Sequence, residues 1–251
     1  MTLEKTKEKM MTLLNNIKQS FMVAIFLALN ANAQVSNDGI ILSEVKYQVQ
    51  NIQWHTLNNS DAWGFTIETQ LDNGNGKLQQ RIQRYDPNLE LHNQWQLIEQ
   101  SKEKPSKAIL HEYAKTQESM RNSAPPVNTD NVELVYLVTL AFEKDFEDYA
   151  VFSFKPRLPM FDDDVNKVFE GKLYFNKANN YIEKLTINAS EPFSPGFSVE
   201  VEKYDMKIEL SKIEENLHVT HIESNKSGSA FIFSSFDEMS TRKISHFVVK
   251  K

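Results

Sequence analysis

The chain has 251 residues, a formal net charge of −6 at pH 7 and no cysteine. The acidic balance argues against nucleic acid and anionic membrane surfaces as partners, because both attract proteins through an excess of Lys and Arg. The lack of cysteine excludes disulfides, thiol nucleophiles, cysteine-ligated zinc and the lipid anchor of a bacterial lipoprotein.

Residues 1–33 have the pattern of a cleavable signal peptide. The start is polar and basic, Phe21–Leu29 is an uncharged apolar run, and Ala31 and Ala33 are small residues at the two positions that signal peptidase reads. The alternative is an uncleaved anchor, but nine apolar residues rise only about 14 Å as a helix, roughly half of the hydrocarbon thickness. We therefore expect cleavage between Ala33 and Gln34, export to the periplasm and a mature form without a membrane anchor.

The leader carries four lysines and two glutamates, a net charge of +2, so the remaining 218 residues carry −8. A chain of this length buries a sizeable core, and β domains of this size are often single. We expect residues 34–251 to form one antiparallel β domain.

Residues 45–85 predict strands. An alternating run covers residues 45–54, with a slip of phase between Val49 and Ile52 that a β-bulge would produce. A second run covers residues 63–71. The loop 72–76 is rich in Asn and Gly, which tolerate positive φ, and the run from Lys77 to Tyr85 completes a predicted hairpin.

The middle of the chain predicts a short strand over Trp95–Gln100 and one amphipathic helix over Ser106–Met120. Ser106 is the expected N-cap, and the helix has a face at helical spacing. That face consists of Ile109, Leu110, Tyr113, Gln117 and Met120. Residues 121–131 are the expected mobile connection, and the apolar run Val132–Phe142 fits either a strand or a buried helix.

From Asp148 onward, period-two runs separated by short turns predict an antiparallel meander, because parallel pairing needs long crossovers. The predicted fold is mainly β (α+β): a curved antiparallel sheet, or unclosed half-barrel, with one or two helices packed in its concave side. The inward residues either line an apolar cavity or fill a packed core, and periodicity does not separate the two. The candidate cavity-lining residues are Phe152, Phe154, Phe169, Leu173, Phe175, Phe197, Phe231 and Phe233.

No motif for catalysis, metal binding or cofactor binding stands out. His111-Glu112 begins like a zinc-protease helix, but Lys115 stands where the second His is needed. His218 and His221 are three apart in a predicted strand, so we expect them on opposite faces. Asp162–Asp164 lacks the spacing of a calcium loop and is interpreted as a solvated loop. We expect no catalytic residue, no metal and no cofactor.

Two stretches carry a resemblance to a known family. One is Trp95–Ile98 followed by Lys104–Ser106 and the helix; the other is Tyr149–Pro156 leading into Phe169–Phe175 and Tyr181–Ile187. The second resembles periplasmic lipoprotein carriers of the LolA/LolB type, in which a G-x-L-x-(Phe/Ile) strand turns through Asn-rich residues into I-x-x-L-x-I. The resemblance covers residues 95–250 and implies an unclosed half-barrel that holds acyl chains in an apolar cavity. Residues 121–142 depart from the pattern, and the arginine that the carriers use in their cavity has no clear counterpart, so no binding residue carries over.

These observations lead to two main hypotheses about function. The first is an exported, non-enzymatic periplasmic protein that binds or carries a lipid, an acyl chain or a lipoprotein. The second is a cell-envelope protein–protein interaction module with a packed core and no ligand; an enzyme ranks third, because no catalytic set is visible. A cavity of several hundred Å³ lined by Phe and Met would favour the carrier, and a packed interior would favour the interaction module.

Overall fold

The computed structural model of the chain describes residues 41–53, 62–74, 78–123, 134–158, 161–196, 198–231 and 234–251. The strands lie in one structural unit, Val45–Lys251; of the other unit, Met1–Glu44, only residues 41–44 are described, and these are helical. The predicted cleavage site at Ala33 and Gln34 lies outside the described residues, as do Phe197 and Phe233. None of the helices in the described part of the chain combines the length and apolarity needed to cross a bilayer.

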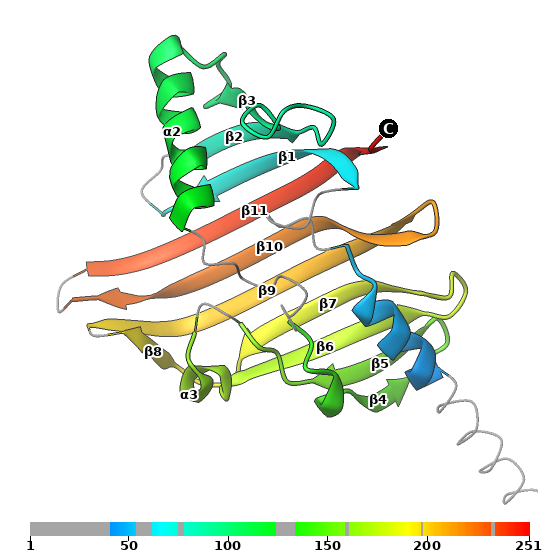
Figure 1. Cartoon of the computed structure of the whole chain (residues 1–251). Helices are drawn as coiled ribbons and strands as arrows, with labels where there is room; N and C mark the ends of the chain where they lie inside the picture. Colours follow the sequence, from blue (N-terminus) through cyan, green and yellow to red (C-terminus); the bar gives the residue numbers. More distant parts are fainter. Residues whose placement is uncertain are drawn as a thin grey trace, which may run out of the picture. The chain divides into compact units, whose positions relative to one another are not determined.

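In the described part of the chain, eleven antiparallel strands form one curved, unclosed sheet (Figure 1). The strands are β1 Trp63–Asp72, β2 Leu78–Tyr85, β3 Trp95–Gln100, β4 Ala141–Asp145, β5 Tyr149–Phe154, β6 Phe169–Asn176, β7 Tyr181–Ala189, β8 Phe193–Gly196, β9 Val199–Ile213, β10 Asn216–Ala230 and β11 Ser234–Val249. Their order is β3-β2-β1-β11-β10-β9-β7-β6-β5-β4, with β8 paired to β9 off this path. The predicted fold class is confirmed, including the hairpin of β1 and β2 and the meander after Asp148.

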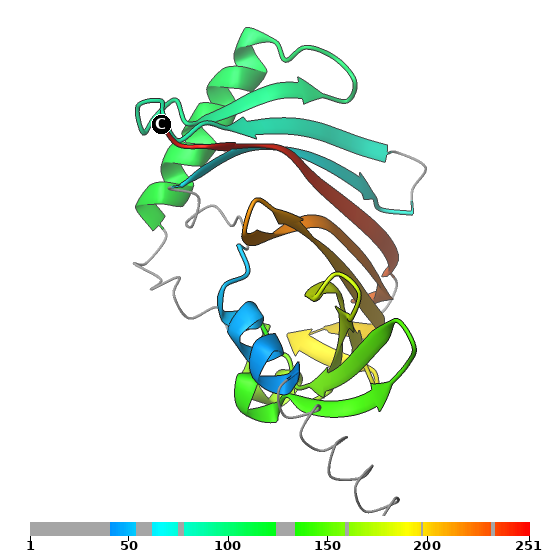
Figure 2. The same cartoon turned by 90° about the vertical axis from the view of Figure 1, so that its right-hand side faces the viewer.

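The consecutive strands β3 and β4 lie at opposite edges of this sheet, so the chain between them must pass from one edge to the other. Helix α2, Lys107–Ser123, belongs to this passage and lies on the concave side of the sheet (Figure 2). The predicted N-cap is confirmed, because the backbone N–H of Ile109 donates to Ser106 Oγ at 3.3 Å. The helix therefore covers the inner face of the sheet at the β1–β3 end.

Residues 45–50 are helical, and the prediction of a strand here is wrong. Val45, Gln48, Val49 and Ile52 are all buried, and their spacing is that of one helical face. Tyr47, which an alternating strand would place beside Val45 and Val49, is 64% exposed. Val45 and Val49 fit both periods, and burial against the sheet selects the helical one.

Gln48 fixes the helical residues 45–50 to the start of β7. Its amide Nε2 donates to the carbonyl of Asn180 at 3.0 Å, and its Oε1 accepts from the backbone N–H of Ile182 at 2.9 Å. A buried amide that both donates and accepts satisfies backbone groups that the β6–β7 turn would otherwise leave open.

Three further segments differ from the sequence-based expectations. Between Leu134 and the start of β4 the chain is neither a strand nor an α-helix, and it contains the short 3-10 helix η2, Leu137–Thr139. Phe231, expected on the inner face, lies instead in the turn that follows β10, with a φ of 57°. Asp162–Asp164, expected as a solvated loop, instead begins helix α3, Asp163–Asn166. Asp162 is the N-cap, and Asp162 Oδ1 accepts from the backbone N–H of Val165 at 2.8 Å.

An aromatic cluster fills the inner face beside α3 and β8. Phe169 stacks on Phe161 with ring centroids 5.4 Å apart, and Phe193 and Tyr204 contact it edge-on at 5.1 and 5.3 Å. Burial raises the pKa of Tyr204 to about 12, so this hydroxyl stays neutral in the core. Edge-to-face contacts at these distances stabilise a core beyond simple area burial.

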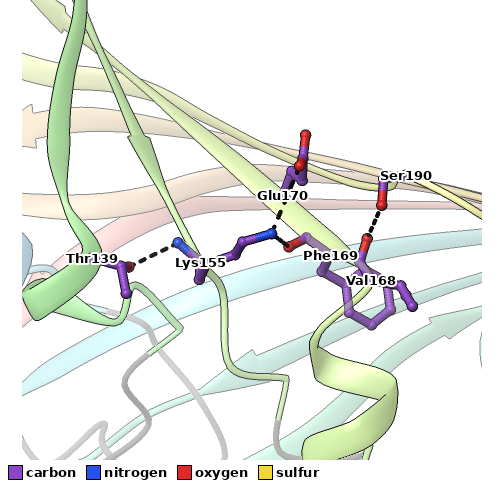
Figure 3. Close-up of polar contacts among 6 residues, drawn as sticks. All are labelled: Thr139, Lys155, Val168, Phe169, Glu170 and Ser190. Carbon is purple, nitrogen blue, oxygen red and sulfur yellow. Dashed lines mark hydrogen bonds and ion pairs between the residues drawn. The ribbon is translucent and has the colours of Figure 1, made fainter.

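Polar contacts fix the backbone around this cluster (Figure 3). The backbone N–H of Lys155 donates to Thr139 Oγ1 at 2.9 Å, and its ammonium donates to the carbonyl of Phe169 at 3.5 Å. The same ammonium lies 3.7 Å from a carboxylate oxygen of Glu170, and Ser190 Oγ donates to the carbonyl of Val168 at 2.8 Å. These contacts hold the end of β5 and the beginning of β6 beside each other.

We predict that Gly171→Ala destabilises this half of the sheet. A Cβ at Gly171 would lie 2.3–2.7 Å from ring atoms of Phe154, which is buried and has no room to shift. Overpacking of this kind costs about 1–3 kcal/mol of unfolding free energy, measurable by urea denaturation. Gly196→Ala is the matched control, because nothing lies within 4 Å of a Cβ built there. Equal stability of the two variants would contradict the packing described here.

Candidate ligand-binding site

One transverse row of inward side chains crosses the whole sheet and changes character half-way. Register pairing connects ten residues, one from each strand of the main path. From the β4 edge to the β3 edge they are Phe142, Phe152, Leu173, Leu185, Ile208, Ile222, Arg242, Thr69, Arg81 and Gln100. Directly paired residues point to the same face. This row is therefore apolar from β4 to β10 and polar or cationic from β11 to β3.

The apolar half of the inner face is packed. Phe152, Phe169 and Leu173 are fully buried, and Phe154 and Phe175 are at most 4% exposed. These five predicted cavity-lining residues therefore lie on the inner face, but in the core rather than along the cavity described below. Phe231 does not line the interior, because it lies in the β10–β11 turn and is 74% exposed.

The cavity lies in the other half, between α2 and strands β1, β2, β3 and β11. Its volume is about 700 Å³, which is within the usual range for a small-molecule site. The sheet contributes Ile67, Thr69, Arg81, Gln83, Trp95, Leu97, Gln100 and Arg242; the helix contributes Ala108, Ile109, Glu112, Tyr113, Thr116 and Gln117. The cavity is open to solvent along the helix, since Ile109 is 38% exposed although it faces the sheet.

A single direct hydrogen bond among the described residues ties the cavity-lining face of α2 to the sheet. Gln83 Nε2 donates to the hydroxyl oxygen of Tyr113 at 2.9 Å. Burial raises the pKa of Tyr113, while the bond from Gln83 and the charge of Arg81 act in the opposite direction. The hydroxyl therefore stays protonated, and its proton can be donated into the cavity.

The cavity changes polarity along the strands. Three successive rows of inward residues lie on its sheet side: Trp95, Tyr85 and Phe65; then Leu97, Gln83 and Ile67; then Gln100, Arg81, Thr69 and Arg242. In the first row only Trp95 lines the cavity, and Tyr85 and Phe65 are buried beside it. Successive rows on one face are about 6.7 Å apart, so about 13 Å separates the aromatic row from the arginine row. One end of the cavity is apolar and the other is cationic.

The two arginines make no ion pair with any described residue, whereas several lysines of the outer sheet face pair with carboxylates. Burial lowers the pKa of Arg242, and the positive charge of Arg81 lowers it further. Arginine remains charged at this degree of perturbation, so two like charges face one cavity.

A second hollow, of about 760 Å³, lies on the outer face of β5, β6, β7 and β9. Its polar groups are already satisfied by one another. Tyr149 donates to Glu183 at 2.8 Å, and Lys184 lies 3.9 Å from the ring centre of Tyr174. The inner cavity, which holds unpaired cationic groups, is therefore the stronger candidate for a ligand site.

In the described part of the chain, no group of three His, Asp or Glu side chains is placed to bind a metal ion. His111 is exposed on α2, and Lys115 there pairs with Glu112 at 3.2 Å. We expected His218 and His221 on opposite faces because side chains alternate along a strand. A β-bulge between Val219 and His221 interrupts that alternation. His218 packs against Trp63, and His221 lies beside Glu209 at 3.8 Å.

The sequence-based reasoning found Tyr113 as part of the helix face but missed Arg81 and Arg242. A signal for both was present. Arg81 is two and four residues before Gln83 and Tyr85 in an alternating strand, and Arg242 is two residues before Ile244. A charged side chain in phase with the buried positions of a strand indicates a polar site on the inner face.

The fold and the site define an open antiparallel half-barrel with a ligand-sized cavity under a helix. No family model and no curated protein matches this chain. Among solved structures it is similar to a LolA superfamily protein from Nitrosomonas europaea, with a TM-score of 0.35, 11% sequence identity and coverage of 85% of this chain and 94% of that chain. A similarity of this extent carries no information about a ligand, so any assignment of a ligand has to come from the residues of this chain.

We predict that His218 makes the protein less stable at mildly acidic pH. Its side chain is fully buried, and burial lowers its pKa from 6.5 to about 4. As pH falls from 6.5 towards 4, the unfolded chain gains a proton at this residue that the folded protein does not, so stability is lost across this window. Between about pH 7 and pH 5 this loss amounts to about 2 kcal/mol.

Denaturant unfolding at a series of pH values tests this prediction. His218→Phe keeps an aromatic ring between Trp63 and Phe247 and should remove about 2 kcal/mol of the pH dependence. His111→Phe, on the exposed side of α2, should leave the pH dependence unchanged. An unaltered slope in His218→Phe would show that another group is responsible.

Proposed function

We propose that this chain is an exported, non-enzymatic binding or carrier protein that holds the acyl chain of an amphipathic ligand in the cavity under α2. The observation that carries the proposal is the cavity itself, about 700 Å³ with an apolar end lined by Ile67, Trp95, Leu97 and Ile109. Each CH₂ group transferred from water into such a site contributes about 0.8 kcal/mol.

The way α2 packs supports a site for a removable ligand. Ile109 on its cavity-lining side is 38% exposed, so an apolar surface that folding could have sealed is left in contact with water. An occupant of the cavity would remove that surface from water without displacing packed side chains. The same helix is tied to the sheet through Gln83 and Tyr113, which limits how far it can collapse onto the sheet.

The alternative of an interaction module with a packed core accounts for only half of the molecule. It predicts a filled interior on the whole inner face, as found between β4 and β10. The open space between α2 and β1–β3 has no role in that alternative. Export to the periplasm is part of our proposal through the signal-peptide pattern of residues 1–33.

Native mass spectrometry of the protein purified without detergent tests the proposal. We expect one equivalent of an uncharged acyl ligand, monopalmitin, to bind and to be recovered unmodified. Affinity should rise about fourfold for each CH₂ group between monolaurin and monopalmitin, because each group contributes about 0.8 kcal/mol. Binding that does not depend on chain length would contradict an apolar cavity, and hydrolysis of the ester would contradict a non-enzymatic role.

A pair of neighbouring variants locates the binding site. Ile109→Trp places a larger ring in the cavity and should weaken monopalmitin binding by about tenfold or more, because the acyl chain loses several CH₂ positions. Leu110→Trp is the control, since Leu110 is similarly exposed at 40% but does not line the cavity. Titration calorimetry should show this control within about twofold of the unmodified protein. Equal affinities for the two variants would place the ligand elsewhere.

A further inference from the structure

Resting on the proposed function, we infer that the ligand is an anionic amphiphile whose carboxylate or phosphate head is bound between Arg81 and Arg242. Both arginines line the cavity and occupy the same transverse row, one on each side of Thr69. Two strand spacings separate their Cα atoms, a distance of about 10 Å, and both long side chains lie on the face that α2 covers. That spacing allows two guanidinium groups to converge on one small anion.

The surroundings of the two arginines supply no countercharge. Their partners across the strands are Thr69, Gln100 and Ile222, none of which is charged. Among the described residues that line the cavity, the one carboxylate belongs to Glu112, and its Oε1 already lies 3.2 Å from the ammonium of Lys115. An anion in the cavity would relieve the repulsion between Arg81 and Arg242.

The contrast with the outer face shows that this arrangement is particular to the cavity. The outer lysines lie beside carboxylates, as in the pairs Lys172–Glu143 at 2.7 Å and Lys203–Asp205 at 3.1 Å. On the inner face outside the cavity, Lys226 also pairs with Glu238, at 2.9 Å. The chain as a whole has a net charge of −6 and repels anions at long range. An isolated pair of arginines on the inner face therefore provides a local site for an anion on an otherwise acidic protein.

The chemistry of the groups beside the arginines fits an oxyanion. Guanidinium groups bind carboxylate and phosphate in a bidentate manner, with hydrogen bonds stronger than those between neutral groups. The hydroxyls of Thr69 and Tyr113 and the amide of Gln100 line the same cavity and can donate to further oxygens. The apolar row at Trp95 begins about 13 Å away, so head and tail sites belong to one continuous ligand.

Binding of matched ligands tests this inference. The probes share one acyl chain and differ in the head: monopalmitin is uncharged, palmitic acid carries a carboxylate, and palmitoyl lysophosphatidic acid carries a phosphate. We expect at least one of the anionic ligands to bind about tenfold tighter than monopalmitin or better, as a charge-assisted pair of hydrogen bonds requires. The tighter of the two anions identifies the head group.

Variants then assign the effect to residues. Arg81→Gln and Arg242→Gln should each weaken anion binding about tenfold, and the loss should be clearly larger than the loss of monopalmitin affinity in the same variant. Arg84→Gln is the matched control, because Arg84 lies three residues further along β2, on the opposite face of the strand, and does not line the cavity. Thermal unfolding of each variant checks that the fold is retained.

The outcomes separate this inference from the proposed function. Equal affinity for monopalmitin and both anions, unaffected by Arg81→Gln and Arg242→Gln, would overturn the inference and leave the acyl-binding function intact. Failure of all three ligands to bind would overturn the proposed function, and the inference with it. Selective loss of anion binding in the two cavity variants would establish the head-group site.

Discussion

The pairing of the first strand with the last determines the rest of this structure. β1 and β11 pair antiparallel from Trp63 and Val249 to Asp72 and Met239, and this pairing joins the hairpin side of the sheet to the meander side. It also places β3 and β4, consecutive in the chain, at opposite edges. The connection between them has to run from one edge to the other, and its helix α2 lies on the concave side (Figure 2).

The inner face then divides into two halves with different contents. Between β4 and β10 the side chains of the row are Phe, Leu and Ile, and most of them are buried. Between β11 and β3 the same row contains Arg242, Thr69 and Arg81, which cannot be buried in a packed core without a partner. Helix α2 covers this half without filling it, so the cavity forms where the sequence changes from apolar to charged.

This division gives the cavity its chemical character. An entirely apolar half-barrel would collapse onto its helices or bind any apolar molecule, since burial of apolar surface is not directional. Two charged groups at one end give a ligand an orientation, because an amphiphile can satisfy them only with its head. The packed half serves as a rigid frame. Within it, the ring of Phe169 stacks on Phe161, and the backbone carbonyl of Phe169 accepts a hydrogen bond from the ammonium of Lys155.

The class of fold and most of its elements could be predicted from the order of the amino acids alone. Alternation in residues 63–85 and after Asp148, together with short turns, was sufficient for the antiparallel sheet, and Ser106 with its helical spacing was sufficient for α2. Val45 and Val49 fit both the period of a strand and the period of a helix, and the prediction of a strand was wrong. The correct period depends on which side chains distant strands bury, and this is not visible in the local pattern.

The position of the cavity, in contrast, depends on how distant segments of the chain pack together. The phenylalanine-rich strands are the apparent place for an apolar site in the sequence, yet there the rings face one another and fill the space. The cavity-lining residues Arg81, Arg242 and Tyr113 come from segments up to 161 positions apart, and strand register and the crossing of α2 bring them together. Period and composition are local properties of a chain, whereas an unfilled space between elements depends on how separate segments pack.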